Sequence, residues 1–135
     1  MQPPPNAADL LAVVGEVLTD EIVPALRGPS QHHARVAASL VGIVERELRL
    51  GPEADEAERT ALLGVLGRGA AVSDATGDDD GHTDLAELRA EIVNRLRAGM
   101  ADDPTVAIDV WQALMDSVRA DLRICKPGHD DWDGD

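Results

Sequence analysis

Two groups of side chains in this sequence have the types and spacing that could do chemistry. The first is His32, His33 and Arg35, at the start of a segment with helical periodicity, residues 31–48. Histidine titrates near neutral pH and can transfer a proton or bind a ligand. Arginine beside it can bind an anion through several N–H groups. The three residues are therefore candidates for a ligand-binding site.

His33 lies at helical spacing from the apolar residues Val36, Ala37 and Leu40. We therefore expect its ring to point toward the interior of the fold. It is then either a proton-transfer or ligand-binding histidine, or a histidine at the rim of the core that bonds to a neighbouring helix or loop. We favour the second interpretation, because acid–base catalysis needs a positioned partner and the sequence shows none.

The second group is the acidic segment TGDDDGHTDLAE, residues 76–87, which partly matches a twelve-residue calcium-binding loop. Gly81 falls at the position of the sharp turn, and a predicted helix follows. The match fails at the first ligand, because Thr76 stands where a carboxylate belongs. We therefore favour a solvated acidic loop over a calcium site. The carboxylates that fall at metal-ligand positions are Asp78, Asp80, Asp84 and Glu87.

Other signatures of enzymes are missing from the sequence. The single cysteine, Cys125, excludes an internal disulfide and a multi-cysteine zinc site, and we expect it to be a small buried hydrophobic residue. We find no phosphate-binding or dinucleotide-binding glycine pattern, no nucleophile elbow, and no Glu-x-x-His pair of the kind that builds metal sites in helical bundles. We therefore expect no catalytic activity and no cofactor.

Composition and charge exclude further classes. The chain has 135 residues, the length of one domain, and its core must be aliphatic because it has no Phe, no Tyr and two Trp. Its net charge of −14 disfavours binding to nucleic acids and to anionic membranes. No apolar run approaches 18 residues, and the N-terminus lacks the pattern of a signal peptide. We therefore expect a cytoplasmic protein.

Apolar periodicity predicts an all-α, single-domain bundle of about five amphipathic helices in residues 1–126, followed by an acidic flexible tail in residues 127–135. Asn6, Asp84 and Asp103 are the expected N-caps of three helices. Gly51 and Pro52 should end the second helix and open the third. The residues that we expect to be buried together are Val14, Leu18, Leu40, Val44, Leu62, Leu88, Ile92, Trp111, Leu114 and Val118.

Three segments carry a resemblance: ADLLAVVGEVLTDEIVPALRG at 8–28, HARVAASLVGIVERELRLGPEAD at 33–55, and DLAELRAEI at 84–92. In their order and sequence they resemble a small all-helical bacterial family of unknown function. The resemblance implies an accessory protein, often encoded beside kinases of the aminoglycoside-phosphotransferase type and beside acyl-CoA dehydrogenases. The family has no established catalytic residue to carry over. The chain departs from the family in its acidic 74–84 segment and in its ending ICKPGHDDWDGD.

Together these observations predict a helical accessory or interaction protein without catalytic activity of its own. The expected partner is a protein, either a phosphotransferase-like or an acyl-CoA dehydrogenase enzyme by resemblance, and a homo-oligomer is left open. The alternative is a small-ligand or metal-binding protein that uses the bundle interior near His33 or the 76–87 segment.

Overall fold

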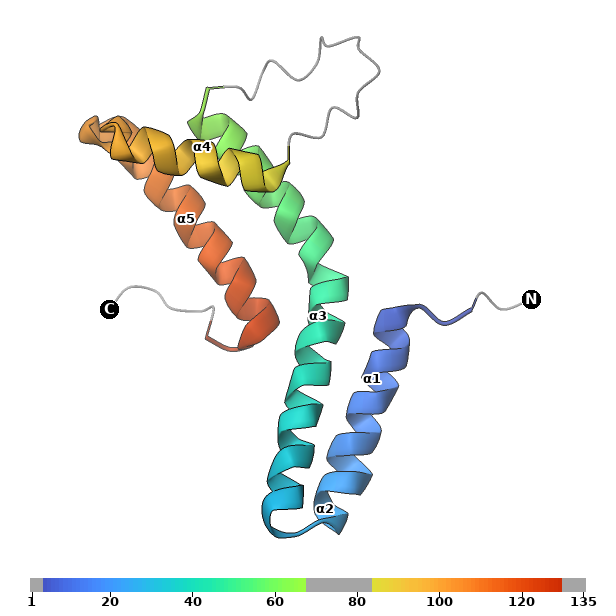
Figure 1. The fold of residues 1–135 in the computed structure, drawn as a ribbon. Helices are drawn as coiled ribbons and strands as arrows, with labels where there is room; N and C mark the ends of the chain where they lie inside the picture. Colours follow the sequence, from blue (N-terminus) through green and yellow to red (C-terminus); the bar gives the residue numbers. More distant parts are fainter. Residues whose placement is uncertain (1–3, 68–83, 130–135) are drawn as a thin grey trace.

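The computed structural model describes residues 4–67 and 84–129, and this part of the chain is helical, with no strand. The all-α prediction is therefore confirmed, with four long helices instead of five. The elements in chain order are α1 (Ala7–Val17), the π-helical segment η1 (Leu18–Ile22), α2 (Val23–Ala25), α3 (Gly28–Val65), α4 (Leu85–Arg97), the 3₁₀ turn η2 (Met100–Asp102) and α5 (Pro104–Cys125) (Figure 1).

The N-caps form as predicted. The side chain of Asn6 accepts a hydrogen bond from the backbone N–H of Asp9 at 2.8 Å. Asp84 accepts from the N–H of Ala86 at 3.1 Å, and Asp103 accepts from Thr105 at 2.9 Å. Each cap satisfies a backbone donor that the first turn of a helix leaves without an intrahelical partner.

The first three elements form one continuous rod (Figure 1). A proline at position 24 favours the end of a helix or a kink near Ile22, but the helical backbone continues through α2 to Ala25. Proline has no N–H and its ring crowds the preceding turn of an α-helix. The π-helical segment widens the backbone just before Pro24, and the N–H of Val23 bonds to the carbonyl of Leu18. At the end of the rod, the side chain of Gln31 donates to the carbonyl of Val23 at 3.0 Å.

The predicted break at Gly51 and Pro52 was wrong, because α3 runs through both residues as one helix of 38 residues. An interior proline costs one hydrogen bond but holds φ near the helical value. The residue before it is usually pushed out of the helical region by contact with the proline ring, and Gly51 has no Cβ to make that contact worse. At 1.5 Å per residue, α3 is roughly 57 Å long and spans the molecule.

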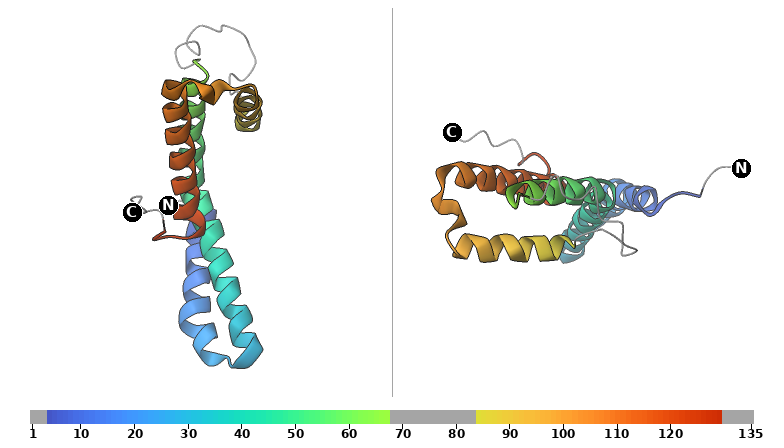
Figure 2. Two further views of the ribbon diagram at one scale, coloured as in Figure 1. Left: turned by 90° about the vertical axis from the view of Figure 1, so that its left-hand side faces the viewer. Right: turned by 90° about the horizontal axis from the view of Figure 1, so that it is seen from above.

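The other helices are arranged along α3 (Figures 1 and 2). α1 packs antiparallel against its N-terminal half, and α5 packs antiparallel against its C-terminal half. α4 crosses the C-terminal end of α3, and in the described part of the chain it contacts neither α1 nor α5. The molecule is therefore an elongated row of helix pairs, and α3 is the only long helix that all the others share.

The core lies where α4 crosses α3. Its buried side chains are Leu62, Leu66, Leu85, Leu88 and Ile92, with Leu63, Val65, Leu96 and Met100 packed against them. Of the ten residues expected to be buried together, Leu62, Leu88 and Ile92 are in this cluster and Leu18 is half-buried. The expectation was wrong for the remaining six, which are exposed: Val14, Leu40, Val44, Trp111, Leu114 and Val118. Cys125 is also exposed, contrary to the sequence prediction.

The position of the core predicts that substitutions at two residues of α4 have very different effects on the free energy of unfolding. Leu88 is 1% exposed, whereas Val93 is 44% exposed on the same helix. Leu88→Ala should lower the free energy of unfolding by about 2–5 kcal/mol, because it leaves a cavity in the cluster. Val93→Ala should change it by less than about 1 kcal/mol, because little packing is lost at an exposed position. Denaturant titration measures both, and equal losses would contradict the assignment of the core.

Candidate functional site

The three residues His32, His33 and Arg35 lie on the first turns of α3, and all three are exposed. The expectation that His33 points into a core was therefore wrong. The two imidazole rings are 6.1 Å apart and tilted at 57°. The buried residue of this turn is Ala34, which lies between His33 and Arg35 in the sequence. Among the described residues, no acidic or basic side chain is positioned to exchange a proton with either ring.

The acidic segment is only partly covered by the structure. Asp78 and Asp80 lie outside the described residues, so a calcium site there stays a prediction. Asp84 uses one carboxylate oxygen to cap α4, and Glu87 is exposed in the first turn of that helix. Within the described ranges, no group of three or more His, Cys, Asp or Glu side chains is arranged to hold a metal ion.

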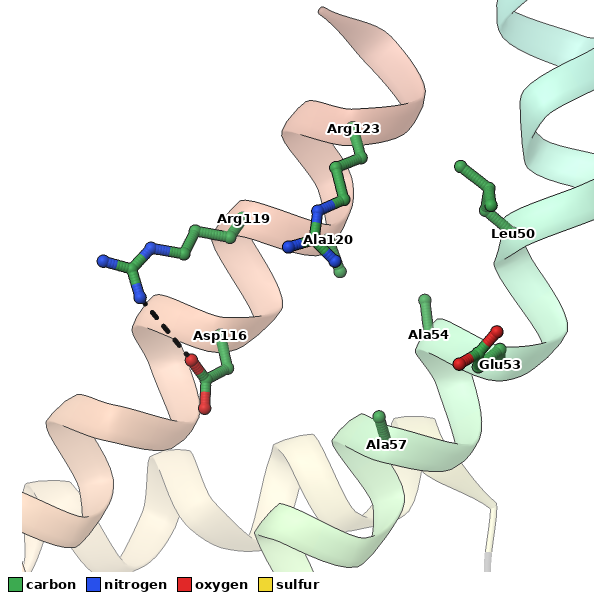
Figure 3. A pocket seen from close by; sticks show the side chains of 8 residues that line it. All are labelled: Leu50, Glu53, Ala54, Ala57, Asp116, Arg119, Ala120 and Arg123. Atoms are coloured by element: carbon green, nitrogen blue, oxygen red, sulfur yellow. Dashed lines mark ion pairs between the residues drawn. The ribbon is translucent and has the colours of Figure 1, made fainter. Parts of the chain in front are cut away.

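A groove of about 430 Å³ runs between the facing sides of α3 and α5 (Figure 3). Its floor is made of small side chains, and four charged groups stand at its edges. Arg119 extends along its own helix toward Asp116, and the two charged groups are 3.8 Å apart. The two acidic and two basic side chains balance, so the groove has no net charge with which to select an ion. The lining residues are Leu50, Glu53, Ala54, Ala57, Asp116, Arg119, Ala120 and Arg123.

Polar contacts between helices hold the pairs in place. Arg89 on α4 donates two hydrogen bonds, of 2.8 and 2.6 Å, to the carboxylate of Glu58 on α3. These bonds raise the pKa of Arg89, so its guanidinium stays charged at any physiological pH. Arg46 on α3 donates through Nε to the carbonyl of Ile124 at 2.7 Å and fixes the end of α5 against α3.

The most distinctive feature of the surface is two exposed apolar faces. The first, the hairpin face, lies on the α1–α3 pair. Gly15 of α1 lies against Val41 of α3. One side of this contact is a shallow groove that includes the charged residues Glu16 and Glu45. The other side is the hairpin face, whose large exposed side chains are Leu10, Val14, Val36, Leu40, Val44 and Leu48.

The second, the α5 face, is the outer side of α5. This helix buries Val110, Ala113 and Ile124, and Ala113 and Ala120 allow its backbone to lie close to α3. Several of its large side chains are nevertheless exposed, and Trp111 is 64% exposed. The α5 face consists of Ile108, Trp111, Leu114 and Val118, which recur at helical spacing. Helical periodicity indicated both stripes, but the sequence carried no signal that they would be exposed.

The chain belongs to a family of unknown function, described as Domain of unknown function (DUF6285), whose model matches residues 24–129. The match covers two of the three segments that carried the resemblance, 33–55 and 84–92, and the end of the first. No curated protein and no solved structure matches the chain. In the described part of the chain, no helix has both the length and the apolar character needed to cross a lipid bilayer.

The residues of the acidic segment 76–87 predict the outcome of a calcium titration. We expect no saturable binding tighter than roughly 1 mM, because the loop lacks its first carboxylate and Asp84 already caps a helix. Isothermal titration of the whole protein with CaCl₂ measures this, with Glu87→Gln as the paired variant. Micromolar binding to the natural chain that is lost in Glu87→Gln would show that the segment is a metal site.

Proposed function

We propose that this chain is a helical interaction protein without catalytic activity of its own, and that it binds a partner enzyme through the α5 face. The observation that carries the proposal is the outward position of Trp111 among three exposed aliphatic side chains. Contiguous exposed apolar surface of this kind marks sites of protein association. Tryptophan is also among the residues that contribute most to binding energy at such sites.

The lack of catalytic activity is supported by the geometry around the histidines. His32 and His33 are exposed and have no positioned acid–base partner among the described residues. The groove between α3 and α5 has balanced charges on an open surface. The alternative function, ligand binding in a bundle interior near His33, has less support, because His33 is exposed. The other form of that alternative, metal binding by residues 76–87, is the subject of the calcium titration.

The proposed partner comes from the resemblance. It is a phosphotransferase-like kinase or an acyl-CoA dehydrogenase, the two kinds of enzyme that the resemblance implies are often encoded beside such proteins, and the proposed compartment is the cytoplasm. A partner with basic side chains around an apolar pocket fits best, because residues 51–135 carry 20 acidic and 8 basic side chains. The apolar face then supplies most of the affinity, and the negative charge of residues 51–135 favours partners of opposite charge.

Binding to the purified neighbouring enzymes tests the proposal. Biolayer interferometry should detect an interaction with one of them, and Trp111→Ala should weaken it roughly 30-fold, as loss of about 2 kcal/mol at a central aromatic residue implies. Gln112→Ala is the matched control, because Gln112 is the next residue and is also exposed; it should bind like the natural chain. Absence of binding to every neighbouring enzyme, or equal affinity of the Trp111→Ala variant, would contradict the proposal.

A further inference from the structure

The hairpin face is not covered by any described helix of the chain. The α1–α3 pair extends away from α4 and α5 (Figures 1 and 2). α5 reaches α3 at Arg46, which follows Val44 by two residues and therefore points about 200° away from it around the helix. Leu40 is 57% exposed at the centre of the face, and its neighbours Val36 and Val44 are 44% and 49% exposed.

Leu40 is the centre of the apolar stretch Val36, Leu40 and Val44 on α3, and Leu48 extends the stripe only on the C-terminal side, where its counterpart at equal distance before Leu40 is His32. Val36 and Val44 lie four residues before and after Leu40, and His33 and Glu47 lie seven residues before and after it. At 100° per residue, Val36 and Val44 are displaced by equal angles to opposite sides of Leu40, and so are His33 and Glu47. All of these side chains are exposed.

Equal spacing about Leu40 has a specific consequence for self-association. When two identical helices pack antiparallel about a two-fold axis, the residues that meet lie at equal distances before and after the residue on the axis. With Leu40 on the axis, Leu40 meets its own copy and Val36 meets Val44. His33 then meets Glu47 of the second copy, which places an imidazole beside a carboxylate at both ends of the stripe.

The distribution of charge also favours the hairpin face as the place where two copies of the chain meet. Two copies with a net charge of −14 each repel one another, so contact is least costly where the charge is small. Residues 1–50 carry 6 acidic and 4 basic side chains, whereas the rest of the chain carries 20 and 8. The hairpin lies in the nearly neutral part of the chain. The α5 face lies in the strongly acidic part and is less suited to a second copy.

We propose that two copies of this chain associate through their hairpin faces, with Leu40 on the two-fold axis and His33 of each copy beside Glu47 of the other, to form a four-helix bundle. From His33 to Leu48 the face is roughly 22 Å long, and two helices make it roughly 20 Å wide. Those dimensions place the dimer at the small end of specific interfaces, so it dissociates reversibly in the micromolar range. The proposal is independent of the proposed function, because it uses a different face.

Sedimentation of the whole chain between about 1 and 100 µM tests the dimer. The natural protein should pass from monomer to dimer across this range. Leu40→Asp should remain monomeric at the highest concentration, because two carboxylates would face each other on the axis. Ile108→Asp is the matched control, since it also places a charge at an exposed aliphatic position, and it should dimerise like the natural chain. A natural chain that stays monomeric throughout, or a Leu40→Asp variant that dimerises normally, overturns the proposal.

Changing the charges of His33 and Glu47 tests the pairing of residues across the proposed dimer in a separate experiment. His33→Glu should weaken the dimer roughly tenfold, because symmetry places two glutamates together at both ends of the stripe. Adding Glu47→Arg to the same chain should restore the affinity. Failure of the second substitution to restore it overturns this register.

Disulfide cross-linking tests the dimer without a substitution that destabilises it. Leu40→Cys in a Cys125→Ser background should form a disulfide-linked dimer under mild oxidation, whereas Ile108→Cys in the same background should not. The reverse result also overturns the proposal.

Discussion

The rest of the structure depends on α3 continuing through Gly51 and Pro52. A helix that turned back at this point would bring α1 and α5 together around one core. Because the helix does not turn, α1 and α5 lie against different halves of it and cannot cover each other. Each therefore buries only some of its apolar side chains against α3 and leaves others exposed. The continuation of the helix through a proline thus leaves two apolar faces that no described part of the chain covers.

Much of the local structure could be predicted from the sequence, because it is set by interactions within a few residues. The caps at Asn6, Asp84 and Asp103 formed as expected, and Leu88 and Ile92 are buried where α4 meets α3. The continuation of α3 through Pro52 was not predictable from local preference, which favours ending a helix there. α5 lies along α3 from Arg46 to Ala57 and so packs against the helix on both sides of that position.

The candidate site, like the fold, could be predicted only in part from the sequence. Periodicity placed His33 correctly on the same stripe as Leu40, but it does not say what covers a stripe. The sequence prediction assumed that another helix of the same chain would do so, and the structure leaves both residues exposed. Exposed apolar residues at helical spacing then indicate a surface that contacts another molecule. The acidic segment differs, because its central carboxylates lie outside the described residues.

The most direct test of the central claim is a distance along α3. Spin labels at His33→Cys and Thr60→Cys, both exposed positions, in a Cys125→Ser background report this distance by pulsed electron resonance. Dilution with unlabelled protein removes distances between copies. A continuous helix of 27 residues between the labels predicts roughly 40 Å. A single distribution near that value supports the uninterrupted helix. A distribution centred below roughly 25 Å would show that the chain turns back at Gly51 and Pro52, and would contradict the account.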